Sequence, residues 1–418
     1  MYSILLLGAT GYTGTLCAKF IAEHYPTNVH WCIGGRSEQK LRALARELRE
    51  LYPDRVQPGI ELVELTKESL ESVVRKAEVV VNGVGPFHRF STPIVEACSR
   101  EGTHYLDFST ETLWIAELIE KYEDAASESG AVIIPGISPT APADLLAWLI
   151  TKATRERYSR GPGEIVSAGK LSIKAMTPGS LTTVLDSFTT WGASWYLSGN
   201  SGSWVLTSRK QPPRLVPKSP LLSRTLGYRL NPVLGPLTTS FTGPGNAAVV
   251  HRSAAQNPEL YGEDFQYKEY LPATGIWNAI FIHCATKIFI LLLWIPLVRG
   301  LVRKLMASTD GDLPDQEVLR RAERAEYRAV GGIGGLKGTE KGVIEASLLR
   351  EGALYEFTAL LTCVGARVLL ERKSKESGEE PARKGGFFTP SFLGMEYVDG
   401  LRDAGVQIEM RSADGKAY

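Results

Sequence analysis

Three glycines near the start of the chain have the spacing of a phosphate-binding loop. Gly8, Gly11 and Gly14 follow the apolar run 3–7 and precede a stretch with a helical pattern. In such a loop the first glycine permits a tight turn, the second lets the backbone approach a pyrophosphate, and the third lets the helix pack on the sheet. The helix N-terminus adds N–H groups and partial positive charge. The spacing predicts a dinucleotide site, with a plain tight turn as the alternative.

Arg36 indicates which dinucleotide this site would take. NAD sites carry an acidic residue at the end of the second strand, where this chain has Arg36 in the sequence GGRS. A guanidinium suits a ribose 2′-phosphate by its charge and by its fork of donors. We therefore predict NADP, with Ser37 as a neighbouring cofactor-binding candidate and the cap of the next helix. An arginine that simply faces water is the alternative.

A second glycine-containing loop, NGVGPF at 82–87, follows another apolar strand. Ligands of open α/β sheets bind at the carboxyl ends of the strands. We therefore expect Gly83 and Gly85 to lie near the ribose and nicotinamide of the cofactor. The alternative is an ordinary turn at the end of a strand.

Candidate catalytic groups cluster in HYLDFSTE, residues 104–111. Tyr105 could donate a proton, and Asp107 or Glu111 could orient it. The two acids could instead cap the following helix. His88 and His104 also lie near strand ends, but a single histidine is more often structural, so they rank lower.

The elements that must position these groups alternate regularly from residue 3 to about 137. Six short apolar strands with helices between them predict an α/β fold, a doubly wound parallel sheet of Rossmann type. The alternation then stops, and a mixed α/β domain is expected, with a helix over 180–197 and strands over 167–176, 246–255 and 265–272. Residues 211–220 are expected to form an extended linker, and 371–386 a charged, mobile loop.

The composition excludes several classes of function. The formal net charge of +1 over 418 residues gives no reason to expect nucleic acid as a partner. The five cysteines are scattered, which is typical of reduced thiols and a cytoplasmic protein. The six histidines form no metal-ligand spacing, so no metal site is expected. The apolar run at the N-terminus is too short for a signal peptide and lacks a basic start.

Six motifs in order resemble the saccharopine-dehydrogenase-like oxidoreductases. The resemblance is greatest to the trans-acting enoyl reductases of mycobacterial lipid synthesis and to the animal saccharopine-dehydrogenase-like oxidoreductase, and it covers nearly the whole chain. The combination is far more specific than any single motif. The motifs are GATGYTG (8–14), GGRS (34–37), VVVNGVGPF (79–87), IVEACSREGTHYLDFSTE (94–111), PGNAAVVHRS (244–253) and GGFFTPSFLG (385–394).

The resemblance implies a Rossmann domain with a second α/β domain inserted into it. We accordingly expect an NADP-binding domain at 1–143, a substrate- or membrane-associated domain at 144–384, and a segment at 385–418 that returns to the first domain. Three motifs depart from the family pattern: DFSTE has Thr110 for glycine, GISPTAPAD (136–144) keeps only Asp144 of its acids, and PGSL (178–181) is reduced. These loops should face the active site, so their change leaves the substrate open. By the same resemblance, the cofactor contacts are Gly8, Thr10, Gly11, Tyr12, Thr13, Gly14, Arg36 and Gly85.

An uncharged segment of eleven residues, 288–298, lies within the longer apolar stretch 276–302. Basic residues flank it, and Pro296 should interrupt a helix there. Three interpretations stay open: a helix that lies on a membrane or lipid-droplet surface, the wall of a buried pocket, and a transmembrane span.

Three functions follow from these observations. The first is an NADP-dependent enoyl reductase acting on an apolar, lipid- or polyketide-like acyl substrate, free or bound to a carrier. The second is a saccharopine-type dehydrogenase that makes or breaks a C–N bond. The third is a non-catalytic NADP-binding protein on the cytoplasmic side of a membrane or lipid droplet. A homo-oligomer stays open in each case.

Overall fold

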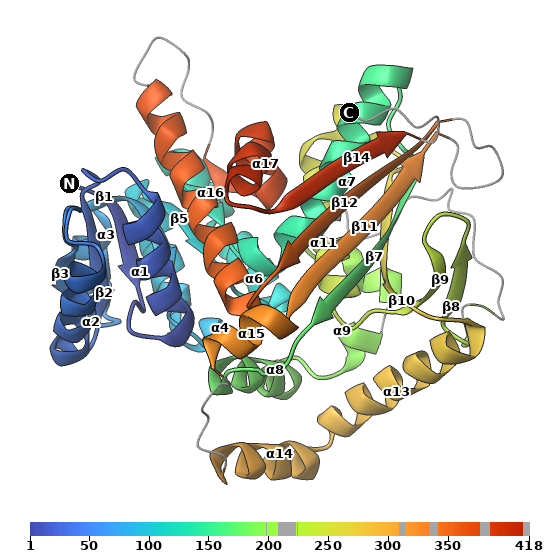
Figure 1. Ribbon diagram of the computed structural model, residues 1–418, viewed down its shortest axis with the longest axis horizontal. Coiled ribbons are helices and arrows are strands. Elements are labelled where there is room, and N and C mark those ends of the chain that lie inside the picture. The colour runs from blue at the N-terminus through green and yellow to red at the C-terminus, as the bar shows by residue number, and fades with distance from the viewer. Residues whose placement is uncertain are drawn as a thin grey trace. The chain divides into compact units, whose positions relative to one another are not determined.

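The chain forms two compact units and passes between them three times (Figure 1). The computed structural model describes residues 1–197, 199–207, 223, 225–308, 315–333, 342–376 and 385–412. Unit 1 comprises 1–141 and 353–404, and unit 2 comprises 142–352 and 405–418. The division differs from the expected one, because the chain returns to the first unit at residue 353 rather than 385. It also leaves again at 405, where the last strand joins the sheet of unit 2.

Unit 1 contains a sheet of seven parallel strands, as the alternating pattern predicts. Its order, β13-β6-β5-β4-β1-β2-β3, places β1 between β4 and β2. The strand order reverses at β1, and ligands of such sheets bind beside that point, at the carboxyl ends of the strands. The strands are β1 (Tyr2–Leu7), β2 (Trp31–Gly35), β3 (Gly59–Leu62), β4 (Ala77–Asn82), β5 (His104–Asp107), β6 (Val132–Ile134) and β13 (Gly386–Phe387).

The helices of unit 1 show how local sequence sets their limits. In α2, Leu41, Leu44 and Leu48 are buried at helical spacing, and Ser37 caps the helix by accepting a hydrogen bond from the Lys40 N–H. Gly130 ends α6 in the left-handed conformation, with φ of 80°. The helices are α1 (Tyr12–His24), α2 (Glu38–Leu51), α3 (Lys67–Val74), α4 (Phe87–Phe90), α5 (Thr92–Glu101), α6 (Thr112–Ser129), α16 (Leu354–Glu376), η2 (Pro390–Leu393) and α17 (Gly394–Asp403).

Helix α16 explains why the chain returns to unit 1 early. It packs against α1, β4, β5 and α17, and it buries a nearly continuous apolar surface from Phe357 to Leu369. Gly365 lies at its closest approach to the core, because a Cβ there would be 2.5 Å from the Ile137 side chain. Residues 371–376 continue this helix, so the prediction of a charged loop is wrong for this part of 371–386. Residues 377–384 and the predicted linker 211–220 lie outside the described residues.

Unit 2 contains a mixed sheet in the order β14-β12-β11-β7-β10-β9-β8. The β7–β10 pair is parallel and the other pairs are antiparallel. Its strands are β7 (Glu164–Ser172), β8 (Tyr228–Asn231), β9 (Gly235–Thr239), β10 (Gln266–Pro272), β11 (Arg324–Gly332), β12 (Val343–Glu351) and β14 (Gln407–Ser412). Its helical elements are α8 (Pro178–Thr190), α9 (Ser194–Leu197), η1 (Gly199–Trp204), α11 (Gly243–Gln256), α12 (Pro258–Tyr261), α13 (Ile276–Trp294), α14 (Pro296–Ser308) and α15 (Gln316–Ala322).

Two segments that sequence patterns assigned to strand or loop are helical. Residues 246–255, predicted as a strand, lie in α11, where 246–254 are all buried. A helix buried on every side has no polar face, so its short apolar run cannot be told from a buried strand by periodicity. The segment 136–144, predicted as a loop, lies largely in α7 (Ile137–Tyr158), which contains Pro142. Asp144 in this helix is buried and accepts a hydrogen bond from the Ser253 hydroxyl.

Candidate functional site

The glycine loop joins β1 to α1 at the point where the strand order reverses. The Gly8 N–H donates to the Gly34 carbonyl at 3.0 Å, which ties the loop to β2, and the Gly83 N–H donates to the Leu7 carbonyl at 2.9 Å. Gly11 precedes α1, and no side chain in the described part of the protein caps this helix end. The N-terminus of α1 is thus left to a ligand, in the position where dinucleotide-binding folds hold a pyrophosphate.

The three loop glycines serve different purposes. Gly8 has φ of +70°, and a Cβ there would lie 2.6 Å from the backbone of Gly83. A Cβ on Gly14 would lie 2.2 Å from the Gly8 carbonyl oxygen, so α1 could not pack so closely. Gly11 is exposed, has φ of −77°, and would hold a Cβ 3.3 Å from its nearest neighbour. The protein itself requires Gly8 and Gly14, whereas only an approaching ligand gives a strong reason for Gly11.

Arg36 is the first residue after β2, at the same edge of the sheet as the glycine loop. Its side chain is exposed, and within the described ranges its guanidinium makes no hydrogen bond or ion pair. Ser37 caps α2, as expected, which fixes the backbone on which Arg36 stands. An unpaired guanidinium beside a dinucleotide loop suits a ribose 2′-phosphate. Thr10, Tyr12 and Thr13 lie in the same loop and the first turn of α1, and all three are partly exposed.

Asn82 organises the loop that follows β4. Its Oδ1 accepts from the Val84 N–H at 3.0 Å, and its Nδ2 donates to the Ser91 hydroxyl at 2.8 Å and to the Tyr105 hydroxyl at 2.9 Å. Ser91 in turn donates to the Val84 carbonyl at 2.7 Å. One buried amide therefore fixes both ends of the loop that carries the two expected cofactor glycines. The sequence shows this asparagine in the motif but gives no sign of its partners.

Gly83 and Gly85 differ in how strongly packing requires a glycine, as Gly8 and Gly11 do. A Cβ on Gly83 would lie 3.1 Å from the Phe108 ring, so this glycine is partly required by packing. Gly85 is exposed, and a Cβ there would meet nothing closer than 3.6 Å. Gly83 lies next to β1, because its N–H donates to the Leu7 carbonyl, and contact of either glycine with the cofactor stays a prediction.

Tyr105 and Asp107 are brought together, but not at a surface. Both side chains are fully buried, and the Tyr105 hydroxyl donates to Asp107 Oδ2 at 2.6 Å. Asp107 Oδ1 accepts from the Ser109 N–H and hydroxyl and from the Gly136 N–H at 2.6–2.9 Å. These hydrogen bonds lower the pKa of Asp107, but burial outweighs them and raises it to about 6. Burial also raises the pKa of Tyr105 far above its usual range. These groups hold the carboxyl ends of β4, β5 and β6 together, and neither side chain is exposed to solvent.

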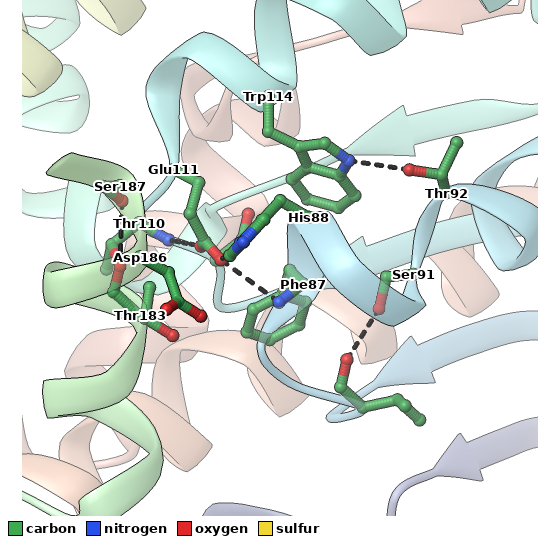
Figure 2. Close-up of polar contacts among 12 residues, drawn as sticks. Phe87, His88, Ser91, Thr92, Thr110, Glu111, Trp114, Thr183, Asp186 and Ser187 are labelled. Atoms are coloured by element: carbon green, nitrogen blue, oxygen red, sulfur yellow. Dashed lines mark hydrogen bonds and ion pairs between the residues drawn. The ribbon is translucent and has the colours of Figure 1, made fainter. Parts of the chain in front are cut away.

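Glu111 binds the turn that precedes α4 rather than capping α6. Its Oε1 accepts from the Phe87 N–H at 3.1 Å and its Oε2 accepts from the Thr110 N–H at 2.9 Å, as Figure 2 shows. It occupies the N-cap position of α6, yet none of its hydrogen bonds among the described residues is a capping bond. Its side chain is fully buried, so Glu111 also does not contact solvent directly.

The buried Glu111 contacts His88, whose side chain is partly exposed. Its Nδ1 lies 3.4 Å from Glu111 Oε1, and its side chain is 10% exposed (Figure 2). The Phe87 ring packs edge-on against Phe108, and Trp114 donates its Nε1–H to the Thr92 hydroxyl at 2.9 Å, which makes the surroundings of this pair rigid. Sequence reasoning ranked His88 below the acids because nothing local shows that Glu111 contacts it.

The remaining histidine candidate, possible metal ligands and the cysteines can each be placed in the structure. His104 Nδ1 accepts from the Val132 N–H at 3.1 Å, and burial lowers its pKa to about 4, so this histidine is neutral and structural. No three His, Cys, Asp or Glu side chains of the described residues come close enough to hold a metal ion. All five cysteines are free thiols, and only that of Cys284 is exposed.

Comparison with known proteins supports this assignment of the loop. Residues 4–134 match the family described as the saccharopine dehydrogenase NADP binding domain. A trans-acting enoyl reductase of Mycobacterium ulcerans (strain Agy99) is 31% identical over 277 residues, 64% of this chain and 65% of that protein. A Mycobacterium tuberculosis protein (strain ATCC 25618 / H37Rv), provisionally named a trans-acting enoyl reductase, is 28% identical over 326 residues, 73% of this chain and 75% of its own. The chain thus spans slightly less than two thirds of the first relative.

The fold has a solved counterpart. The apo saccharopine dehydrogenase (L-Glu forming) of Saccharomyces cerevisiae superposes on 98% of this chain and 100% of its own, with a TM-score of 0.50 and 11% identity. At that identity the similarity shows the fold alone. It confirms the Rossmann-type α/β architecture with a second mixed sheet, and the family match over residues 4–134 confirms the resemblance and NADP as the cofactor.

Proposed function

Because residues 4–134 form a saccharopine dehydrogenase NADP-binding domain, we propose that this oxidoreductase reduces a carbon–carbon double bond in an acyl thioester. The observation that carries the proposal is the exposed, unpaired Arg36 at the same sheet edge as Gly11, the loop glycine that packing does not strictly require. The names of the two mycobacterial relatives support the choice of reaction. The substrate we infer is apolar, either a lipid-type acyl chain or a chain on a carrier.

The residues present fit the cofactor. The uncapped N-terminus of α1 and the exposed backbone at Gly11 suit a pyrophosphate, and Arg36 suits the 2′-phosphate. Gly85, which has room for a Cβ in the protein alone, is suited to a close approach by the nicotinamide end. When bound, NADPH supplies a hydride, and the protein must then provide a proton for the neighbouring carbon.

We assign delivery of that proton to His88. An imidazole is the side chain most suited to proton transfer near neutral pH. His88 lies just after the 82–87 loop, its side chain is partly exposed, and the buried Glu111 carboxylate is 3.4 Å from its Nδ1. Glu111 is held by the backbone N–H groups of Phe87 and Thr110, so it can fix the orientation of the ring. In this assignment Glu111 is a positioning residue, and Tyr105 and Asp107 support the loop.

The test is a substrate screen with purified full-length protein. We expect NADPH consumption with enoyl thioesters, rising with acyl chain length, and deuterium transfer from labelled NADPH to the saturated product. Saccharopine with NADP serves as the comparison for C–N chemistry. Turnover of saccharopine alone would replace our proposal with the dehydrogenase alternative. Tight NADPH binding without turnover of any thioester would refute the enoyl reductase assignment and favour a non-catalytic role.

A further inference from the structure

Helix α13 exposes an apolar face along its whole length. Trp277, Phe281, Ile288 and Leu292 recur at intervals of four, seven and four residues, so they share one side of the helix. Trp277 and Phe281 are 85% and 71% exposed. A surface helix normally presents polar residues on the side away from its protein. An exposed face of large apolar side chains marks a binding surface.

Helix α14, which follows α13 directly, also exposes apolar side chains. Pro296 ends α13 and starts the second helix, as a proline at a first helical position should. Leu297, Leu301 and Leu305 follow at intervals of four residues and are all strongly exposed. Figure 1 shows α13 and α14 (gold) in succession, with α13 beside β8 and β9. We call the exposed side of α13 and α14 the apolar face.

The opposite side of α13 is anchored in unit 2. The Thr238 hydroxyl donates to the Ala279 carbonyl at 2.6 Å, and the Thr239 hydroxyl lies 2.7 Å from His283 Nδ1. Ile290 and Leu293 are buried in a cluster with side chains of α8. Within the described residues, α13 is the one helix long and apolar enough to cross a membrane, by length and composition. A helix that crossed would lose these contacts with its own fold, so the contacts favour a helix that lies on a surface.

The charged residues of 276–308 indicate which kind of surface the apolar face binds. Residues 276–308 contain no Asp or Glu, and they contain four basic residues, Lys287, Arg299, Arg303 and Lys304. Arg303 pairs with Asp186 at 2.7 Å and Arg299 donates to the Leu293 and Trp294 carbonyls, so both arginines are held on the side of α14 away from the leucines. Lys304 is exposed. Trp277 and Trp294 stand at the two ends of α13, and tryptophan favours the boundary between lipid tails and water.

We propose that α13 and α14 lie in the surface of a membrane that contains anionic phospholipids. The apolar face enters the layer between head groups and acyl chains, and the exposed Lys304 beside it contacts phosphate or carboxylate groups. This inference does not depend on the reaction proposed above. It does explain how a protein with an apolar substrate could meet that substrate in a lipid layer.

The experiment is vesicle flotation of purified full-length protein. The vesicles are phosphatidylcholine alone or phosphatidylcholine with phosphatidylserine. We expect the protein to float with the anionic vesicles and to dissociate from them as salt is raised. The double variant Phe281→Glu/Ile288→Glu should lower partitioning at least about tenfold, because two apolar side chains no longer enter the layer. Lys304→Ala should lower it about fivefold on anionic vesicles only.

The matched control is Val318→Glu. Val318 is 54% exposed in α15 of the same unit, outside the apolar face, so this variant should float like the unchanged protein. The urea unfolding transition of each variant, compared with that of the unchanged protein, checks that it is folded. Equal flotation of the double variant and the unchanged protein would overturn the proposal, as would flotation with neither vesicle.

Two other occupants are separated by additional readouts. If the apolar face packs against a second copy of the chain, the lipid-free protein should sediment as a dimer. The double variant Phe281→Glu/Ile288→Glu should then convert this dimer to a monomer. If α13 spans the bilayer, protein expressed in cells should resist alkaline extraction from membranes. Either result overturns a surface-lying helix.

Discussion

The Tyr105 hydroxyl lies 2.6 Å from Oδ2 of Asp107, and neither side chain reaches solvent. The two residues are two positions apart on β5, so they share one face of the sheet. Asn82 of β4 donates to the same hydroxyl, and Gly136 after β6 donates to the same carboxylate. Three strand ends are therefore joined by one hydrogen-bonded group. Residues with the chemistry of an acid and a base thus support the site from beneath instead of acting in it.

Asp107→Asn should change how stability depends on pH. Burial raises the Asp107 pKa from 3.8 to about 6 in the folded state. Between pH 4 and 6 the folded protein keeps a proton that the unfolded chain releases, so this group's contribution to stability is complete below pH 4 and is lost as pH rises through 6. The loss amounts to about 3 kcal/mol. Urea unfolding at several pH values checks this.

His104 and His251 titrate in the same window with the opposite sign. Burial lowers the pKa of each to about 4, so their contributions are complete above pH 6.5 and are lost as pH falls through 4. Both proteins contain the two histidines, so their contributions cancel when the unfolding free energy of Asp107→Asn is subtracted from that of the unchanged protein. A difference that is constant across pH 4–6 would contradict the assignment to Asp107.

Arg36→Ala should weaken NADPH binding about tenfold to a hundredfold and leave NADH binding nearly unchanged. Charge-assisted hydrogen bonds to a phosphate contribute about 1.5–3 kcal/mol, and NADH lacks the 2′-phosphate. Calorimetric titration with both nucleotides measures the two affinities. Arg46→Ala, at another exposed arginine in α2, is the control and should bind both nucleotides normally. Equal losses for NADPH and NADH would show that Arg36 does not read the 2′-phosphate.

Gly11→Ala and Gly8→Ala should separate ligand binding from folding. A Cβ at Gly11 makes one tight contact, 3.3 Å from the Gly8 carbonyl oxygen, and occupies the expected path of the pyrophosphate, so NADPH affinity should fall at least about tenfold while the unfolding free energy falls less than in Gly8→Ala. A Cβ at Gly8 meets the Gly83 backbone at a positive φ, so the protein should lose about 1–3 kcal/mol of stability or more. Calorimetry and urea unfolding provide the two readouts. Normal NADPH affinity in Gly11→Ala would place the pyrophosphate elsewhere.

His88→Gln should lower kcat for the enoyl thioester about 100-fold to 10,000-fold without weakening NADPH binding. Glu111→Gln should lower kcat less, because it disturbs only the orientation of the ring. The exposed His24 provides the control variant His24→Gln, which should keep kcat. Unchanged kcat in His88→Gln would exclude His88 as the proton donor.

The sequence by itself determined the features whose parts are covalent neighbours. The glycine loop, Arg36 at the end of β2, the cap at Ser37 and the alternation of strand and helix all lie within short segments. The chain fixes the distances within such segments, and periodicity reports which side is buried. For that reason the Rossmann-type sheet and the choice of NADP followed from residue types and spacing.

Tertiary structure alone decided the features that depend on what lies across a sheet or beside a helix. Tyr105 and Asp107 have the right types for catalysis, but the strands that flank β5 bury them. Glu111 meets His88 from 23 residues away, and α11 is buried on every side, so its apolar run shows no helical period. Burial is a property of neighbours, and neighbours distant in sequence leave no local signal.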